Sequence, residues 1–86
     1  MTLKDTVDGM LSDDYEERLR AEYQQLQIRL NGLNTFISNY VLGLLPFKPK
    51  TPVEVFINQR RAMLSYLSTL QDRICYENIE IKEVYK

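Results

Sequence analysis

Residues 13–54 read DDYEERLRAEYQQLQIRLNGLNTFISNYVLGLLPFKPKTPVE, and the spacing of apolar residues in this segment predicts the fold. Its apolar positions recur at alternating gaps of four and three residues, the heptad spacing of a helix packed along another helix. The spacing predicts one long helix over about residues 13–43, capped by Asp13 with Glu16 three positions later. The apolar seam of this helix consists of Leu19, Tyr23, Leu26, Leu30, Leu33, Ile37, Tyr40 and Leu44.

The end of the same run predicts a turn and the start of another long helix. Pro46 and Pro49 cannot continue a helix, which leaves a short connector over residues 46–52. The sequence TPVE at residues 51–54 then combines a capping threonine, a proline at the first helical position and a capping glutamate. A second helix is therefore expected over about residues 52–78.

A short connector makes consecutive helices antiparallel neighbours. The seam of the second helix consists of Phe56, Met63, Leu67, Leu70 and Ile74, with Arg60 and Glu77 as polar members. Pairing outward from the turn places Tyr40 near Phe56, Leu33 near Met63, Leu26 near Leu70 and Tyr23 near Ile74. At the far end, Arg18 and Arg20 are expected near Glu77 and Glu80, as weak surface pairs.

The two ends of the chain are less strongly patterned. A short helix is expected over about residues 2–11, capped by Thr2 and with Leu3, Val7, Met10 and Leu11 on one face. Residues 79–86 alternate apolar and charged side chains, which fits either a short strand or a frayed helix end. At 86 residues the chain is one domain, residues 1–86, of the all-α class.

One helical seam covers only part of the apolar residues. Ile57, Leu64 and Gln71, continued by Cys75, form a second stripe, of which the first short helix can cover a part. We expect the remainder to be covered by oligomerisation through helix faces. The alternative is a compact monomeric three-helix bundle. Gly32 lowers the stability of the first long helix and could permit a close backbone approach or a slight bend.

The composition argues against catalysis. The chain contains no histidine, so it offers no Ser-His or Cys-His pair, and it shows neither a zinc motif nor a glycine-rich phosphate loop. The carboxylates at residues 13–17 are explained by the start of a helix. We therefore expect a protein that is not an enzyme, without a metal or a cofactor.

The features that bear on location indicate a cytoplasmic protein. No leader resembles a signal peptide, and the longest apolar stretch, residues 36–47, is too short to span a bilayer. Cys75 is the single cysteine, and it is expected to be a small buried apolar residue. No membrane association is predicted.

The charges indicate where an anionic partner could bind. The net charge is −1, but residues 1–17 carry −5 and residues 18–61 carry +5. Guanidinium and ammonium groups beside aromatic rings suit a phosphate-bearing ligand. Arg60 lies on an apolar seam, where it either meets an anionic partner or extends to solvent. The candidate ligand-binding residues at this end are Asn34, Tyr40, Phe47, Lys48, Lys50, Arg60 and Arg61. Alternatively, Phe47 packs against the end of the hairpin without contacting a ligand, and Lys48 and Lys50 are solvated.

Three segments resemble a known family. They are YEERLRAEYQQL at residues 15–26, NQRRAMLSYL at 58–67 and LQDRI at 70–74. Together, over about residues 13–82, they resemble a family of small phage proteins named for a relative in crAss-like bacteriophages. The most distinctive positions are Gln59, Ala62, Met63, Tyr66 and Arg73. The layout is also similar to that of oligomeric phage sponges that sequester cyclic nucleotides and so counter the CBASS and Thoeris defences, a likeness of architecture alone.

Two functions follow as hypotheses. The first is a phage counter-defence protein that sequesters a cyclic nucleotide or another small anionic signal, without turnover, in the cytoplasm of the infected bacterium. The second is a protein-binding inhibitor or adaptor, such as an anti-CRISPR-type protein, that binds a host defence protein through the acidic segment 5–17 or an apolar helix face. Direct DNA binding is disfavoured, because the basic residues are few and interspersed with acidic ones.

Overall fold

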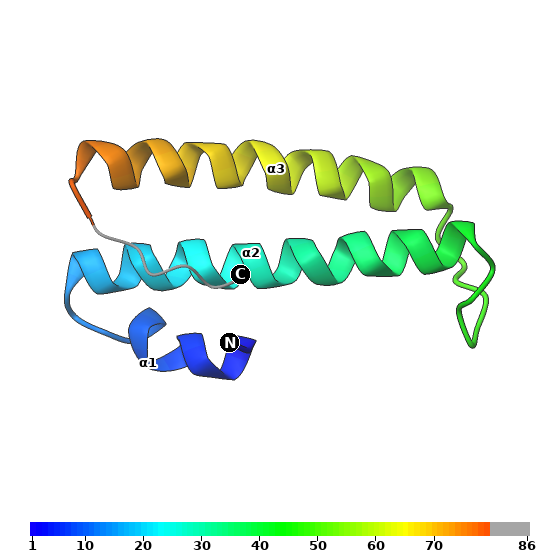
Figure 1. Cartoon of the computed structure of the whole chain (residues 1–86), viewed down its shortest axis with the longest axis horizontal. Helices are drawn as coiled ribbons and strands as arrows, with labels where there is room; N and C mark the ends of the chain where they lie inside the picture. Colours follow the sequence, from blue (N-terminus) through cyan, green and yellow to red (C-terminus); the bar gives the residue numbers. More distant parts are fainter. Residues whose placement is uncertain (80–86) are drawn as a thin grey trace.

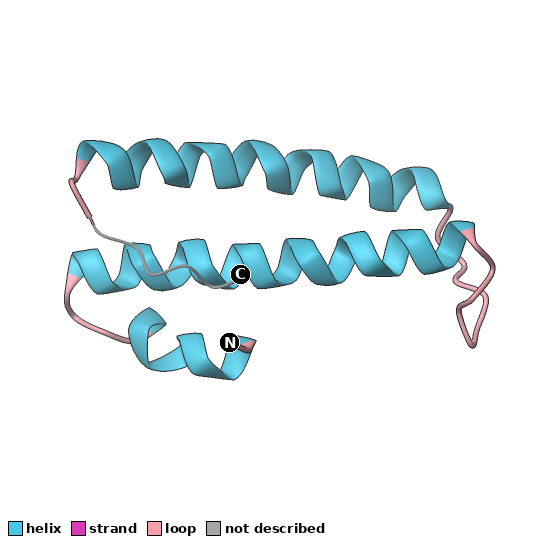
Figure 2. Ribbon diagram, in the orientation of Figure 1, coloured by secondary structure: helices cyan, strands magenta, loops and turns pink. Residues whose placement is uncertain are grey.

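The computed structural model describes residues 1–79 and contains helices and no strand within that range. A 3-10 turn, η1 (Leu3–Thr6), leads into the short α1 (Val7–Met10), which precedes α2 (Tyr15–Val41) and α3 (Val53–Tyr76). The long helices lie antiparallel, and the leading segment lies along the first half of α2 on the side away from α3 (Figure 1; Figure 2). The predicted all-α class and antiparallel hairpin are confirmed. Apart from Ile79, the prediction for residues 79–86 falls outside the described residues.

The cap at the start of α2 lies one residue later than expected. Asp14 accepts a hydrogen bond from the backbone N–H of Glu16 at 3.0 Å, and the Ser12 hydroxyl holds the backbone N–H of Asp14. The helix ends at Val41, because Gly43 adopts a left-handed φ of 72°. Leu44, the last residue of the predicted seam, is therefore outside the helix and exposed.

The second long helix begins at Val53. Pro52 is its N-cap, with an extended ψ of 150° and no side-chain capping bond, so the predicted cap at Thr51 was one residue early. At the other end Asn78 takes a left-handed φ of 57°, which ends the helix at Tyr76.

The core lies between the two long helices; one cluster lies in the half of the hairpin far from the turn, and Ile37 is buried nearer the turn. Leu70 is completely buried, and it forms one cluster with Leu19, Leu26 and Ile74. Tyr23, Met63, Leu67 and Ile79 pack around this cluster. The predicted neighbours of Leu26 and Tyr23 on α3 thus lie in the same cluster.

The leading segment packs in a way that the sequence did not indicate. Its capping box is present, with the backbone N–H of Thr2 donating to Asp5 at 2.8 Å, which lowers the pKa of Asp5. However, it contacts α2 through the buried Thr6 and through Gly9, and it makes no contact with α3. The expectation that it covers the second stripe of α3 was therefore wrong. Its apolar residues are partly exposed to solvent instead: Leu3, Val7, Met10 and, most of all, Leu11.

Two glycines give a matched pair of substitutions. A Cβ at Gly9 would lie 2.7 Å from the Cβ of Ala21, so Gly9→Ala should loosen the leading segment, at a cost of about 1–3 kcal/mol. Gly32 has nothing within 4 Å of its Cβ position, which excludes the close approach considered above. Gly32→Ala should therefore raise the free energy of unfolding by about 1 kcal/mol through helix propensity. Hydrogen exchange of residues 3–10, together with urea unfolding, checks both; unchanged exchange in Gly9→Ala would contradict the packing.

Two smaller expectations were also wrong. Cys75 is exposed rather than buried, because it lies on a flank of α3 that neither α2 nor the leading segment covers. Arg18 donates to the backbone carbonyl of Ser12 at 3.1 Å instead of pairing with Glu77. Glu80 lies outside the described residues. Within residues 1–79, no helix combines the length and the apolar character that crossing a membrane requires.

Candidate functional site

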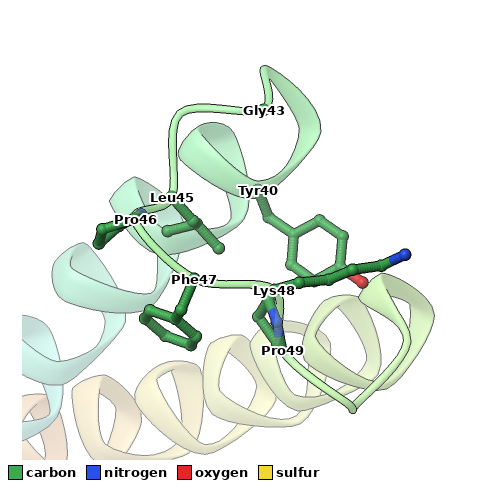
Figure 3. Close-up of a pocket in the computed structure, with 7 residues that line it drawn as sticks. All are labelled: Tyr40, Gly43, Leu45, Pro46, Phe47, Lys48 and Pro49. Carbon is green, nitrogen blue, oxygen red and sulfur yellow. The ribbon is translucent and has the colours of Figure 1, made fainter.

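The turn between the long helices forms an open pocket of about 470 Å³ (Figure 3). One wall comes from the last turns of α2 and the rest from the connector, so the α2–α3 hairpin positions the whole site. Glycine and two prolines fix the path of the backbone, since a left-handed residue and two restricted φ angles leave the connector few conformations. The lining residues are Tyr40, Gly43, Leu45, Pro46, Phe47, Lys48 and Pro49.

Aromatic rings support this end of the hairpin. Phe36 is the centre of the cluster: its ring centroid lies 5.0 Å from that of Phe56 and 6.4 Å from that of Phe47. The Tyr40 and Phe56 centroids are 6.2 Å apart, which confirms their predicted pairing. Phe36 lies off the predicted seam, yet its contacts with Phe56 and Phe47 link the two long helices to the connector.

Tyr40 joins the pocket to the start of α3. Its hydroxyl donates to the backbone carbonyl of Thr51 at 3.3 Å, across eleven residues of chain. Because this bond spans the connector, it restrains the same loop that carries Phe47 and Lys48. Tyr40 is therefore both a wall of the pocket and a brace for the connector.

The predicted ligand-binding residues divide into two groups. Tyr40, Phe47 and Lys48 line the pocket, whereas Asn34, Lys50, Arg60 and Arg61 do not. Phe47 reaches Phe36, as a plug would, but 59% of it is exposed, so its ring is also available to a ligand.

The two arginines differ in their surroundings. Arg61 is exposed, and it donates to the side-chain carbonyl of Asn58 at 3.5 Å. Arg60 is half-buried, and within residues 1–79 its guanidinium makes no ion pair and no side-chain hydrogen bond. The guanidinium of Arg60 is therefore available to pair with an anion.

Four residues of the pocket were not predicted from the sequence. Gly43, Leu45, Pro46 and Pro49 line it, and none of these was proposed as a site residue. The signal was present, because a glycine and two prolines within seven residues indicate a rigid, shaped loop.

The side chains of the pocket indicate which kind of ligand it could hold. It combines an exposed ammonium group on Lys48 with aromatic and proline surfaces, and it holds no carboxylate, thiol or imidazole. Across the described residues, no group of three or more His, Cys, Asp or Glu side chains could hold a metal ion. An ammonium beside a ring suits a ligand that carries both a negative charge and a flat apolar surface.

A second hollow lies along the side of the hairpin. It measures about 260 Å³ and is lined by Gln27, Leu30, Asn31 and Leu67. No charged residue lines it, so it provides no charge-assisted contact for an anion. The turn is therefore the better candidate site.

Two residues that carry the family resemblance have a structural role at the opposite end. Arg73 donates to the Tyr15 hydroxyl at 2.9 Å, and its guanidinium lies 5.8 Å from the centre of the Tyr15 ring. This contact ties the end of α3 to the start of α2. These two positions are thus explained by the fold, without a ligand.

The chain was also compared with known proteins. A protein-family model described as Sequestin matches residues 13–76, a range that contains both long helices and the connector. No curated protein and no solved structure matches the chain.

Proposed function

The chain belongs to the Sequestin family, and from this premise we propose that it is a phage counter-defence protein that sequesters a cyclic nucleotide immune signal without turnover. The family name denotes sequestration, which is a binding function. The nature of the ligand, the phage origin, the absence of catalysis and a location in the cytoplasm of the infected bacterium are parts of the proposal.

The observation that carries the proposal is the pocket at the hairpin end. Lys48 supplies an ammonium donor for a phosphate oxygen, and Phe47 and Tyr40 supply ring faces on which a base can stack. A cyclic nucleotide combines these two chemistries in one small molecule. Arg60, half-buried and without a partner within residues 1–79, lies in the second turn of α3 and adds positive charge at the same end of the hairpin.

Oligomerisation is part of the same proposal. Apolar side chains on the outer surface of α3 are exposed, namely Val55, Leu64 and Tyr66. Burying such surface between helix faces is favourable at about 25 cal/mol per Å².

Calorimetric titration with a panel of cyclic dinucleotides, cyclic trinucleotides and cyclic ADP-ribose isomers tests the proposal. We expect heat of binding with at least one member of the panel, saturating at a fixed ratio of ligand to chain. A protein with confirmed helical content that gives no heat with any of them would overturn the proposal. Linear mononucleotides serve as the matched control for charge and base.

A second candidate function is a protein-binding inhibitor. It is favoured by the leading segment, which presents exposed apolar residues beside acidic ones. A pull-down from host lysate that recovers no stoichiometric partner would count against it.

A further inference from the structure

The leading segment has an apolar face that the rest of the chain covers only in part. Because Thr6 and Gly9 face α2, the apolar residues Met1, Leu3, Val7, Met10 and Leu11 are exposed; Leu11 alone is 77% exposed. Residues 1–17 contain one lysine and six carboxylates, a net charge of −5. This face therefore suits a surface that is both apolar and basic.

The hairpin end has that character. Val41, Leu42, Leu44 and Phe47 are each more than half exposed there, beside Lys48 and Lys50. Residues 36–61 contain four basic side chains and one carboxylate, a net charge of +3. The two surfaces are thus complementary in charge, and both are apolar.

The two surfaces of one chain cannot meet. The molecule is 42 Å long, and the leading segment lies along the first half of α2, whereas the hairpin end lies at the opposite end of the long axis (Figure 1). A contact between them therefore requires two molecules.

We propose that the leading segment of one copy docks on the hairpin end of a second copy. The contact is heterologous, so it leaves a free leading segment and a free hairpin end on every pair and continues head to tail. It is separate from the lateral association of helix faces. Burial of apolar side chains provides its affinity, and the opposite charges set its direction.

The contact also competes with ligand binding, an inference that rests on the proposed function. The docked segment covers Phe47 and Lys48, so an anionic ligand in the pocket and the second copy exclude each other. The acidic segment would then hold the site until ligand displaces it. The self-association itself is measured without any nucleotide, so its failure and the failure of ligand binding are distinguishable.

Charge-reversed variants of the full chain test the contact by sedimentation at low salt. One variant carries Asp8→Lys with Asp13→Lys, and the other carries Lys48→Glu with Lys50→Glu; all four positions are exposed, and none forms a helix cap. The apparent mass of the wild type should keep rising with concentration. Each variant alone should associate at least roughly tenfold more weakly. In the first variant the charge of residues 1–17 changes from −5 to −1, which removes most of the attraction, and in the second the charge of residues 36–61 changes from +3 to −1, so that two negative surfaces meet. An equimolar mixture should recover a 1:1 complex, since the mixture contains one native copy of each surface.

A variant with the same change of charge elsewhere is the control. Asp72→Lys with Glu77→Lys alters two exposed residues at the far end of α3, outside both surfaces, and should keep the wild-type dependence on concentration. The proposal is overturned if the wild type shows no growth in mass, if the two variants behave as the wild type does, or if their mixture shows no complex. Circular dichroism of each variant verifies that the helices are intact.

Discussion

Replacement of Leu70 by alanine is expected to lower the free energy of unfolding by about 3 kcal/mol, the largest loss of stability from a single change in this chain. Leu70 is fully buried between the long helices, in contact with the cluster of Leu19, Leu26 and Ile74. Truncation removes apolar contacts and leaves a cavity that the rigid helices fill only in part. Small domains have total stabilities of only about 5–15 kcal/mol, so the variant should unfold at a much lower urea concentration.

Leu64→Ala is the matched control, because it makes the same chemical change in the same helix. Half of the Leu64 side chain is exposed, and we expect it to cost less than about 1 kcal/mol in dilute protein. Urea unfolding followed by circular dichroism measures both. Equal losses from the two variants would show that α3 does not pack on α2 through the Leu70 face.

Replacement of Lys48 by alanine is expected to weaken ligand binding roughly tenfold to a hundredfold, without loss of stability. A hydrogen bond to a charged group contributes about 1.5–3 kcal/mol, and Lys48 is the basic residue that lines the pocket. Since the side chain is exposed, its truncation leaves no cavity. Calorimetric titration with whichever ligand binds the wild type measures the change.

Arg29→Ala is the control for net charge. It removes one exposed basic residue from the middle of α2, outside the pocket and outside the leading segment, and should leave the affinity within about twofold. Lys50→Ala should have an intermediate effect, because Lys50 lies in the same connector but does not line the pocket. A loss with Arg29→Ala as large as with Lys48→Ala would mean that the pocket has no special role.

The hairpin was predictable because each local signal agreed with the global arrangement. The heptad seam indicates that α2 and α3 pack along each other, and the short, proline-rich connector makes them antiparallel. The packing of Tyr40 on Phe56 followed from counting outward from the turn. The helix ends differed by one or two residues, since the left-handed residues Gly43 and Asn78 and the proline at position 52 set the exact boundaries.

The leading segment was less predictable, because it does not bury the apolar face that its sequence pattern indicates. Its four spaced apolar residues indicated a buried face, but a small side chain opposite Gly9 allows a close approach that places Thr6 inside instead. Propensity and periodicity do not report such steric fit. The misplacement of Cys75 has the same origin, since its flank of α3 depended on cover from this segment.

The candidate site was predictable in its chemistry and only in part in its shape. Tyr40, Phe47 and Lys48 were selected because basic and aromatic residues converge near the turn. The loop backbone around Gly43 and the prolines determines which of the basic residues face the pocket. Arg60 and Arg61 follow α3 away from that loop, and spacing along the sequence alone could not separate them from Lys48.

The most direct measurement of the sequestration proposal is recovery of the ligand. The chain is saturated with the cyclic nucleotide that gives heat of binding, freed of excess ligand by gel filtration and then denatured by heat, and the released nucleotide is identified by mass spectrometry. The proposal predicts intact cyclic nucleotide in a fixed ratio to the chain, even after long incubation. A linearised or hydrolysed product, or no retained nucleotide after filtration, would contradict it.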